Sequence, residues 1–192
     1  IKCQLVTDES GVLGEGDLLI ILDPLDGTVN ALSGIPFYSV SLAFWGERKY
    51  GFVRNLCTRD GYEAFENGIP LKNGKQIYPD CQQSVGSAYF GKGFQRVFPF
   101  INTWRCFGSL ALELCYVAEG NLKALVDLRE KARIVDIAGA QIIAEASGVK
   151  VTNEKGESSF FEGFLTEEGD FKGESLVCAL PALHRMMLDA MQ

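Results

Sequence analysis

The sequence has a single histidine, no closely spaced cysteine pair and no long apolar run. His184, expected in a terminal helix, argues against a histidine-dependent mechanism. The longest apolar segments, such as Leu18–Leu22, are far shorter than the roughly 20 residues that cross a bilayer. Lysine and arginine number 18 against 25 aspartate and glutamate, a net charge of −7 that repels phosphate backbones. We therefore expect no membrane span and no nucleic-acid partner.

The six cysteines are scattered singly along the chain, at Cys3, Cys57, Cys81, Cys106, Cys115 and Cys178. Most lie in apolar stretches, which predicts reduced thiols in the core of a cytoplasmic protein, with structural disulfides as the alternative. The chain begins at Ile1 and not at Met, and it shows no signal-peptide pattern. We expect it to start inside a longer protein or after processing.

Hydrophobic residues make up 47% of the 192 residues and charged residues 22%, a composition that builds a core and argues against disorder. This length suits one sizeable domain or two small ones that share a cleft. We expect an antiparallel-rich half at residues 1–83 and an α/β half at residues 84–192. Periodicity and turn residues predict strands at 18–22, 37–45, 49–56, 60–65 and 176–179, helices at 109–119, 136–146 and from Pro181 onward, and a surface loop at 67–75.

The sharpest motif is Asp23-Pro24-Leu25-Asp26-Gly27-Thr28-Val29-Asn30, directly after the apolar segment 18–22. Two carboxylates at a strand end suit Mg²⁺, which prefers octahedral oxygen ligands and often shares phosphate oxygens with a substrate. Pro24 stiffens the turn, Gly27 lets backbone N–H groups approach an anion, and Thr28 adds a hydroxyl. A solvated Asp-Pro turn is the structural alternative.

Three further acids lie in similar settings. Asp8 and Glu9 follow an apolar run and precede Asp23 by about one strand and turn. Asp136 stands at the start of an apolar helix, where it either caps the helix or points its carboxylate at a metal. Clustered metal ions at such acids would neutralise phosphate charge and activate water for in-line displacement, without a covalent enzyme intermediate.

The segments Asp23–Asn30 and Val135–Ala140, together with Glu145–Gly148, resemble both signatures of the inositol monophosphatase family of Mg²⁺-dependent phosphatases. The segment Thr7–Asp17 is most similar to the archaeal branch that hydrolyses both fructose 1,6-bisphosphate and inositol monophosphate. The resemblance implies an α/β fold, a layered α-β-α-β-α sandwich of the sugar-phosphatase type, here without the helical layer that precedes the first strand. It also implies a homodimer that acts on a small sugar or inositol phosphate between the two halves of the chain.

Carried over residue by residue, the resemblance implies two or three Mg²⁺ ions per site, with Mn²⁺ as a substitute. Their ligands would be Asp8, Asp23, the carbonyl of Leu25, Asp26 and Asp136. Asp8 stands where the family has a glutamate, so it would bind through a water or a shifted loop, or the adjacent Glu9 would take part in catalysis.

The resemblance also assigns the substrate contacts. Asp26, Gly27 and Thr28 would hold the phosphate, and Thr28 would position the attacking water. Arg105 and Leu110 would border the substrate pocket. Arg129 stands seven residues before Asp136, where inositol-specific relatives carry an acid, and it would favour a bisphosphate. The alternative is a solvated loop in which Arg129, Lys131 and Arg133 pair with Glu130.

Competing functions differ in how well the spacing fits. A haloacid-dehalogenase-type phosphatase needs one residue between its two acids, whereas Asp23 and Asp26 are separated by two. The glycines at residues 11–16 do not match G-x-G-x-x-G, which disfavours a dinucleotide-binding module. A non-catalytic relative that binds metal or sugar phosphate, and an NADP-directed or nucleotide-directed phosphatase of the same family, stay open as alternatives.

Overall fold

The computed structural model describes residues 2–158 and 170–192, so that Ile1 lies outside it. The first half of the chain forms an eight-stranded sheet in the order β2-β1-β3-β4-β5-β6-β7-β8. Its strands are β1 (Cys3–Thr7), β2 (Gly11–Gly14), β3 (Leu18–Asp26), β4 (Ser39–Trp45), β5 (Tyr50–Asn55), β6 (Gly61–Phe65), β7 (Leu71–Lys72) and β8 (Lys75–Gln76). β1 and β3 pair in parallel, and the remaining neighbours pair antiparallel.

The second half forms a five-stranded mixed sheet in the order β10-β9-β11-β13-β12. Its strands are β9 (Val85–Tyr89), β10 (Thr103–Arg105), β11 (Ala124–Ala132), β12 (Lys150–Thr152) and β13 (Glu174–Ala179). The helices are α1 (Thr28–Leu32), α2 (Phe94–Val97), α3 (Leu110–Ala118), α4 (Ile134–Ala146) and α5 (Pro181–Met191), with a 3₁₀ turn at Phe98–Phe100.

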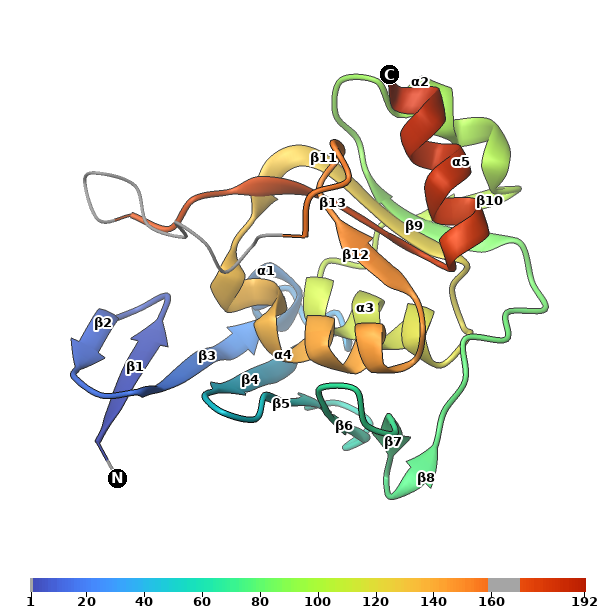
Figure 1. The fold of residues 1–192 in the computed structure, drawn as a ribbon. Coiled ribbons are helices and arrows are strands. Elements are labelled where there is room, and N and C mark those ends of the chain that lie inside the picture. Colours follow the sequence, from blue (N-terminus) through green and yellow to red (C-terminus); the bar gives the residue numbers. More distant parts are fainter. Residues whose placement is uncertain (1, 159–169) are drawn as a thin grey trace.

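The elements stack in four layers, sheet, helices, sheet, helices (Figure 1). α3 and α4 lie between the two sheets, while α2 and α5 cover the other face of the five-stranded sheet. In the part of the chain that the structure describes, α3 and α4 are the helices that pack on the eight-stranded sheet, and its opposite face carries none (Figure 1). The expected layered α/β sandwich is therefore confirmed.

Helix α4 is buried on every side because it lies between two sheets. Residues 134–144 are all buried, and Ile137 and Ile143 are both fully enclosed. Burying each such side chain contributes about 1.5–3 kcal/mol. The helix approaches the eight-stranded sheet so closely that a Cβ on Gly51 would lie 2.1 Å from the carbonyl oxygen of Gly139. This contact fixes the start of α4, and with it Asp136, against the sheet that carries Asp23.

Most predicted elements are confirmed, with boundaries shifted by a few residues. The predicted loop at 67–75 is wrong in part, because β7 and the start of β8 lie within it. Asp136 is the third residue of α4 and not its cap, because the helix begins two residues before the predicted start. All six cysteines are free, as predicted, but only Cys115 and Cys178 are buried. The core placement of the other four thiols is wrong.

The single histidine lies in the interior of the protein. His184 is buried in α5, where its Nε2 lies 2.9 Å from the Thr152 hydroxyl. Burial, together with the nearby Lys150, lowers the pKa of this imidazole.

Among the described residues, no helix is long and apolar enough to cross a membrane.

Candidate active site

A bulge in β3 brings the two acids of the Asp23–Asn30 segment to the same face of the sheet. Residues three apart in a regular strand point to opposite faces. Here Asp23 is paired with Ser41 and Asp26 with Ser39, so that the pairing shifts by one extra residue on β3. Such a bulge restores the common orientation, and both carboxylates are 7% exposed. They face the layer that contains α3 and α4.

Asp26 ties three distant segments together. Its Oδ2 accepts hydrogen bonds from the Ser39 hydroxyl at 3.2 Å and from the backbone N–H of Ala111 at 2.9 Å. The Ser109 hydroxyl donates to the same oxygen. Burial raises the pKa of Asp26 well above its usual range, and the negative charges of Asp23 and Asp136 add to this increase, although the donors oppose it. The carboxylate is thus held rigidly at the start of α3.

Asp23 is electrostatically coupled to the other predicted acids. Its Oδ1 accepts the backbone N–H of Leu25 at 2.9 Å. Burial is the main reason that its pKa rises to about 6, with further contributions from Asp136, Glu9 and Asp8. A concentration of negative charge that raises a pKa in this way is stabilised when a cation binds. Glu9 itself is exposed in the turn that follows β1.

Arg133 joins Asp8 to Asp136. Its Nη1 and Nη2 donate to the two oxygens of Asp8 at 2.5 and 3.0 Å. Its Nη2 and Nε donate to the two oxygens of Asp136 at 2.9 and 3.1 Å. The backbone N–H of Arg133, the N-cap residue of α4, also donates to Asp136 Oδ2 at 3.1 Å. The alternative of a solvated loop paired with Glu130 is wrong here, because Arg133 pairs with two of the predicted metal ligands.

The donor chemistry of this region fits a hard divalent cation, but the side chains do not yet enclose one. Within residues 2–158 and 170–192, no three acidic, histidine or cysteine side chains are arranged as a metal cage. Asp23 and Asp26 offer buried carboxylate oxygens, and Ser41, paired with Asp23, has a buried hydroxyl without a partner among the described residues. Asp8 and Asp136 are held by Arg133. A cation could therefore use all four acids only after Arg133 moves.

The turn after β3 is shaped by Gly27 and Asn30. Gly27 has φ 90°, and a Cβ there would lie 3.0 Å from the Gly108 carbonyl oxygen, so a side chain would be strained and crowded. Asn30 is buried, and its Nδ2 donates to the carbonyls of Phe37 and Phe107 at 2.7 and 2.6 Å. The Thr28 hydroxyl is exposed and donates to the Leu25 carbonyl at 2.9 Å.

A cavity of about 330 Å³ opens beside these acids. Asp26, Asp136 and Leu110 line it, and so do two cations of β11, Arg129 and Lys131. Arg105 is exposed on β10 and is not among the lining residues. Three of the six predicted substrate-binding residues, Asp26, Leu110 and Arg129, thus line one cavity together with Asp136, whereas Gly27 and Thr28 are not among its lining residues.

Arg129 is held in place from two sides. Its Nε and Nη2 donate to the oxygens of Asp127 at 2.9 and 2.6 Å, and Asp127 is fully buried. Its guanidinium carbon lies 3.8 Å from the centre of the Tyr89 ring. No described residue accepts a hydrogen bond from Nη1. The solvated-loop alternative is wrong for Arg129 too, because it is anchored in a strand.

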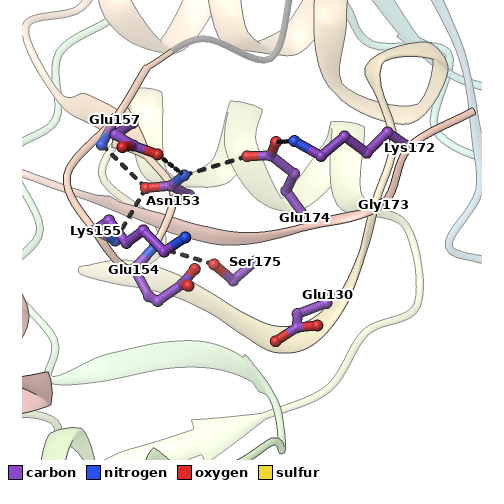
Figure 2. Close-up of a pocket in the computed structure, with 9 residues that line it drawn as sticks. All are labelled: Glu130, Asn153, Glu154, Lys155, Glu157, Lys172, Gly173, Glu174 and Ser175. Atoms are coloured by element: carbon purple, nitrogen blue, oxygen red, sulfur yellow. Dashed lines mark hydrogen bonds and ion pairs between the residues drawn. The ribbon is translucent and has the colours of Figure 1, made fainter. Parts of the chain in front are cut away.

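A second cavity, of about 220 Å³, is lined by Glu130 of β11 and by residues of the segments 153–157 and 172–175, and it gathers several acids (Figure 2). Its side chains are paired with one another. Asn153 donates to Glu157 at 2.9 Å and to Glu174 at 3.3 Å, and Lys172 forms an ion pair with Glu174 at 2.5 Å (Figure 2). This cavity contains none of the predicted site residues.

One buried acid near the site, Glu113 on α3, has no signal in the sequence. This side chain is fully buried, and it accepts hydrogen bonds from the Ser87 hydroxyl, from the Tyr89 hydroxyl at 2.7 Å and from the Phe107 N–H at 3.1 Å. Tyr89 in turn accepts the N–H of Gly108 at 2.8 Å. Glu113 therefore supports the loop that carries Ser109 to Asp26.

Comparison with known proteins agrees with this architecture. The model of the inositol monophosphatase family matches residues 3–191. A fructose-1,6-bisphosphatase/inositol-1-monophosphatase of Archaeoglobus fulgidus is 41% identical over 98% of this chain and 75% of its own length. A bifunctional NADP phosphatase/NAD kinase of Methanocaldococcus jannaschii is 32% identical over 96% of this chain and 39% of its own.

A solved structure gives the same result. A Pyrococcus horikoshii protein, described as having similarities for inositol-1 monophosphatase, superposes with a TM-score of 0.86 at 28% identity, over 100% of this chain and 77% of that one. Against two further archaeal proteins that share the name of the Archaeoglobus relative, the chain spans 63% and 68% of their length. A family model that covers nearly the whole chain, together with these relatives, shows that the chain belongs to the inositol monophosphatase family.

Proposed function

We propose that this chain is a phosphoric monoester hydrolase that cleaves sugar or inositol phosphates by attack of activated water. Fructose 1,6-bisphosphate and inositol 1-phosphate are the first candidate substrates, following the names of its relatives. The observation that carries the proposal is the buried pair Asp23 and Asp26, which the bulge in β3 directs to one face beside the 330 Å³ cavity.

The family is generally metal-dependent, and we propose Mg²⁺, with Mn²⁺ as a substitute. Asp23, Asp26 and Asp136, with Asp8 and the Leu25 carbonyl, would hold two or three such ions. Bound metal would neutralise phosphate charge, lower the pKa of a bound water and stabilise the leaving alkoxide. The number of ions and their identity belong to the proposal.

The chain's own residues would orient the substrate. The left-handed turn at Gly27 would leave room for a phosphate close to the backbone, and the Thr28 hydroxyl would position the attacking water. Leu110 would border the sugar. Glu9, in the turn beside Asp8, would assist this step if Asp8 is too short to reach a metal ion.

The charges around the cavity support a substrate with a second phosphate. Arg129 donates to Asp127, which neutralises its charge, through Nε and Nη2, and its Nη1 has no partner among the described residues. Lys131 lines the same cavity, and no ion pair to it occurs in the described part of the chain. A bisphosphate would place its second anionic group near these two cations.

We also propose a homodimer in the cytoplasm, which light scattering and fractionation of cells would test.

The test compares phosphate release from fructose 1,6-bisphosphate, inositol 1-phosphate and NADP, with Mg²⁺ and with a chelator. We expect release from at least one of the first two that stops without metal. Release from NADP alone would favour the nucleotide-directed alternative. Binding of these ligands without any release would favour a non-catalytic relative.

Asp23→Asn should abolish turnover and leave the fold intact. Asparagine can still accept the Leu25 N–H, and it removes a charge whose burial is unfavourable. Circular dichroism and phosphate release would be measured on this variant and on Asp17→Asn, an exposed control six residues earlier. If Asp23→Asn keeps more than about a tenth of kcat, a loss under about 1.4 kcal/mol, Asp23 is not a metal ligand.

A further inference from the structure

We propose that Arg133 is a built-in counter-ion, which holds Asp8 and Asp136 together in the metal-free chain and competes with a divalent cation for them. The inference rests on the proposed function, because it takes these two acids as metal ligands. It adds a residue that controls how tightly the site binds metal.

The geometry uses the whole guanidinium. The two oxygens of Asp8 accept from Nη1 and Nη2, at 2.5 and 3.0 Å. The two oxygens of Asp136 accept from Nη2 and Nε, at 2.9 and 3.1 Å. Two bidentate edges of one guanidinium are thus filled by two carboxylates, an arrangement that a lysine ammonium cannot reproduce. Each of the four oxygens of these two carboxylates accepts a hydrogen bond from Arg133.

This bridge connects parts of the chain that are otherwise far apart. Asp8 and Arg133 are separated by 125 residues, with Asp8 in the turn after β1 and Arg133 at the N-cap of α4. The backbone N–H of Arg133 also donates to Asp136, so the arginine and Asp136 are fixed to each other at the start of the helix. Asp8, in contrast, is connected to Arg133 only through hydrogen bonds from the arginine side chain.

The surrounding charge explains why a cation is needed there. Asp8 and Asp136 are held to the same guanidinium, Glu9 directly follows Asp8, and Asp23 lies at the end of the neighbouring part of β3. Without metal, these like charges would repel one another, and the guanidinium neutralises the outer pair. When a divalent cation binds, the guanidinium would face a second positive charge at the same oxygens and would have to swing away. The two cations therefore exclude each other.

The salt bridge is partly open to water, which limits the size of the effect. The side chain of Arg133 is 34% exposed and that of Asp8 is 40% exposed. Screening makes such pairs weaker than buried ones. We therefore expect loss of the guanidinium to tighten metal binding about ten-fold, equal to about 1.4 kcal/mol.

The primary experiment measures Mn²⁺ affinity by electron paramagnetic resonance in the absence of substrate. Arg133→Met keeps an unbranched side chain that covers the same apolar surface, and it should bind Mn²⁺ ten-fold or more tightly than wild type. Arg133→Lys keeps the charge but loses the double bridge, and should show an intermediate affinity. Arg129→Met removes the same charge from β11, where the arginine pairs with Asp127, and measures the general electrostatic effect; we expect less than a three-fold change.

Thermal unfolding separates competition from a purely structural role. In the presence of a chelator, Arg133→Met should have a lower unfolding temperature than wild type, by about 2–4 °C for each kcal/mol of unfolding free energy that the substitution removes. In saturating Mn²⁺ this difference should vanish, because the metal replaces the guanidinium. A purely structural role would lower the unfolding temperature equally in both conditions, which would overturn the proposal.

The outcomes also separate this inference from the proposed function. Equal or weaker Mn²⁺ binding by Arg133→Met, with wild-type binding intact, would overturn the role of Arg133 alone. Absence of Mn²⁺ binding in both proteins would overturn the metal site, and with it both proposals. If Arg133→Met does not fold, an unchanged affinity in Arg133→Lys would still overturn the competition.

Discussion

Replacing Glu113 by glutamine should change how the stability of this protein depends on pH. Glu113 is 0% exposed, and burial raises the pKa of its carboxyl group from 4.5 to about 7. Hydrogen bonds from Ser87, Tyr89 and the Phe107 N–H favour the ionised form, but they do not fully compensate. Between the two pKa values the folded chain keeps a proton that the unfolded chain has released. Rising pH therefore destabilises the fold through this group.

The size of this effect follows from the shift. Ionisation of Glu113 destabilises the folded state by about 3 kcal/mol. This penalty is absent below the unfolded pKa of 4.5, and it is fully present above the folded pKa of about 7. Most of the change, about 2.5 kcal/mol, falls between about pH 5 and pH 8. Glutamine does not titrate, so Glu113→Gln loses this dependence.

Glutamine also changes one hydrogen bond in a way that does not depend on pH. Its Oε1 can still accept from Ser87 and from the Phe107 N–H, but its Nε2 cannot accept from the Tyr89 hydroxyl. That hydroxyl already accepts the N–H of Gly108, and loses the partner to which it donated. An unsatisfied buried donor costs about 1–3 kcal/mol. Glu113→Gln should therefore be less stable than wild type at pH 5, and as stable as wild type or more stable at pH 8.

Urea unfolding of wild type and Glu113→Gln across pH 5 to 8 would measure this difference. The control is Glu63→Gln, which removes a partly exposed carboxylate that also accepts a tyrosine hydroxyl, that of Tyr50 at 2.6 Å. We expect the difference between wild type and Glu113→Gln to shift by about 2.5 kcal/mol in favour of the variant as the pH rises. A difference that stays constant within about 0.5 kcal/mol, close to the error of extrapolation, would refute the argument from burial.

Two further variants test the proposed site. Asp8→Glu adds one methylene and should lower the Mg²⁺ concentration needed for half-maximal activity; a titration that is unchanged or worse would remove Asp8 from the metal ligands. Arg129→Ala should raise KM for fructose 1,6-bisphosphate about ten-fold, as expected for a charged hydrogen bond, and change inositol 1-phosphate turnover little. Equal losses on both substrates, or none, would return Arg129 to a structural role with Asp127.

The elements that the sequence predicts well are those whose pattern is local. α3 shows helical periodicity over its length and ends just before Gly120, which has φ 81°. α5 begins at Pro181, where the missing N–H is not needed. Short strands such as β9, β10 and β12 were not predicted, because three to five residues are too few to show a period. Their pairing depends on neighbours far along the chain.

The candidate site is likewise predicted only in part from local sequence. The pairing of Asp23 with Asp26 is evident from their spacing after an apolar strand, but their common orientation requires the bulge opposite Ser39 and Ser41. A bulge in β3 depends on where β4 pairs, which the sequence of β3 alone does not determine. The motif therefore predicted the two neighbouring acids, and the sheet register explains their common orientation.

Arg133 shows why some functional residues escape a reading of motifs. In the sequence it belongs to a run of charges, Arg129, Glu130, Lys131 and Arg133, that is typical of a solvated surface. Glu130 and Asp136 are equally near to Arg133 along the chain, yet Arg133 pairs with Asp136, one helical turn ahead, and with Asp8, 125 residues away. The parallel pairing of β1 with β3 carries Asp8 to the same edge as Asp23, and α4 carries Arg133 there. The fold thus concentrates acids at that edge and brings one arginine within hydrogen-bond distance of two of them, which the local sequence does not reveal.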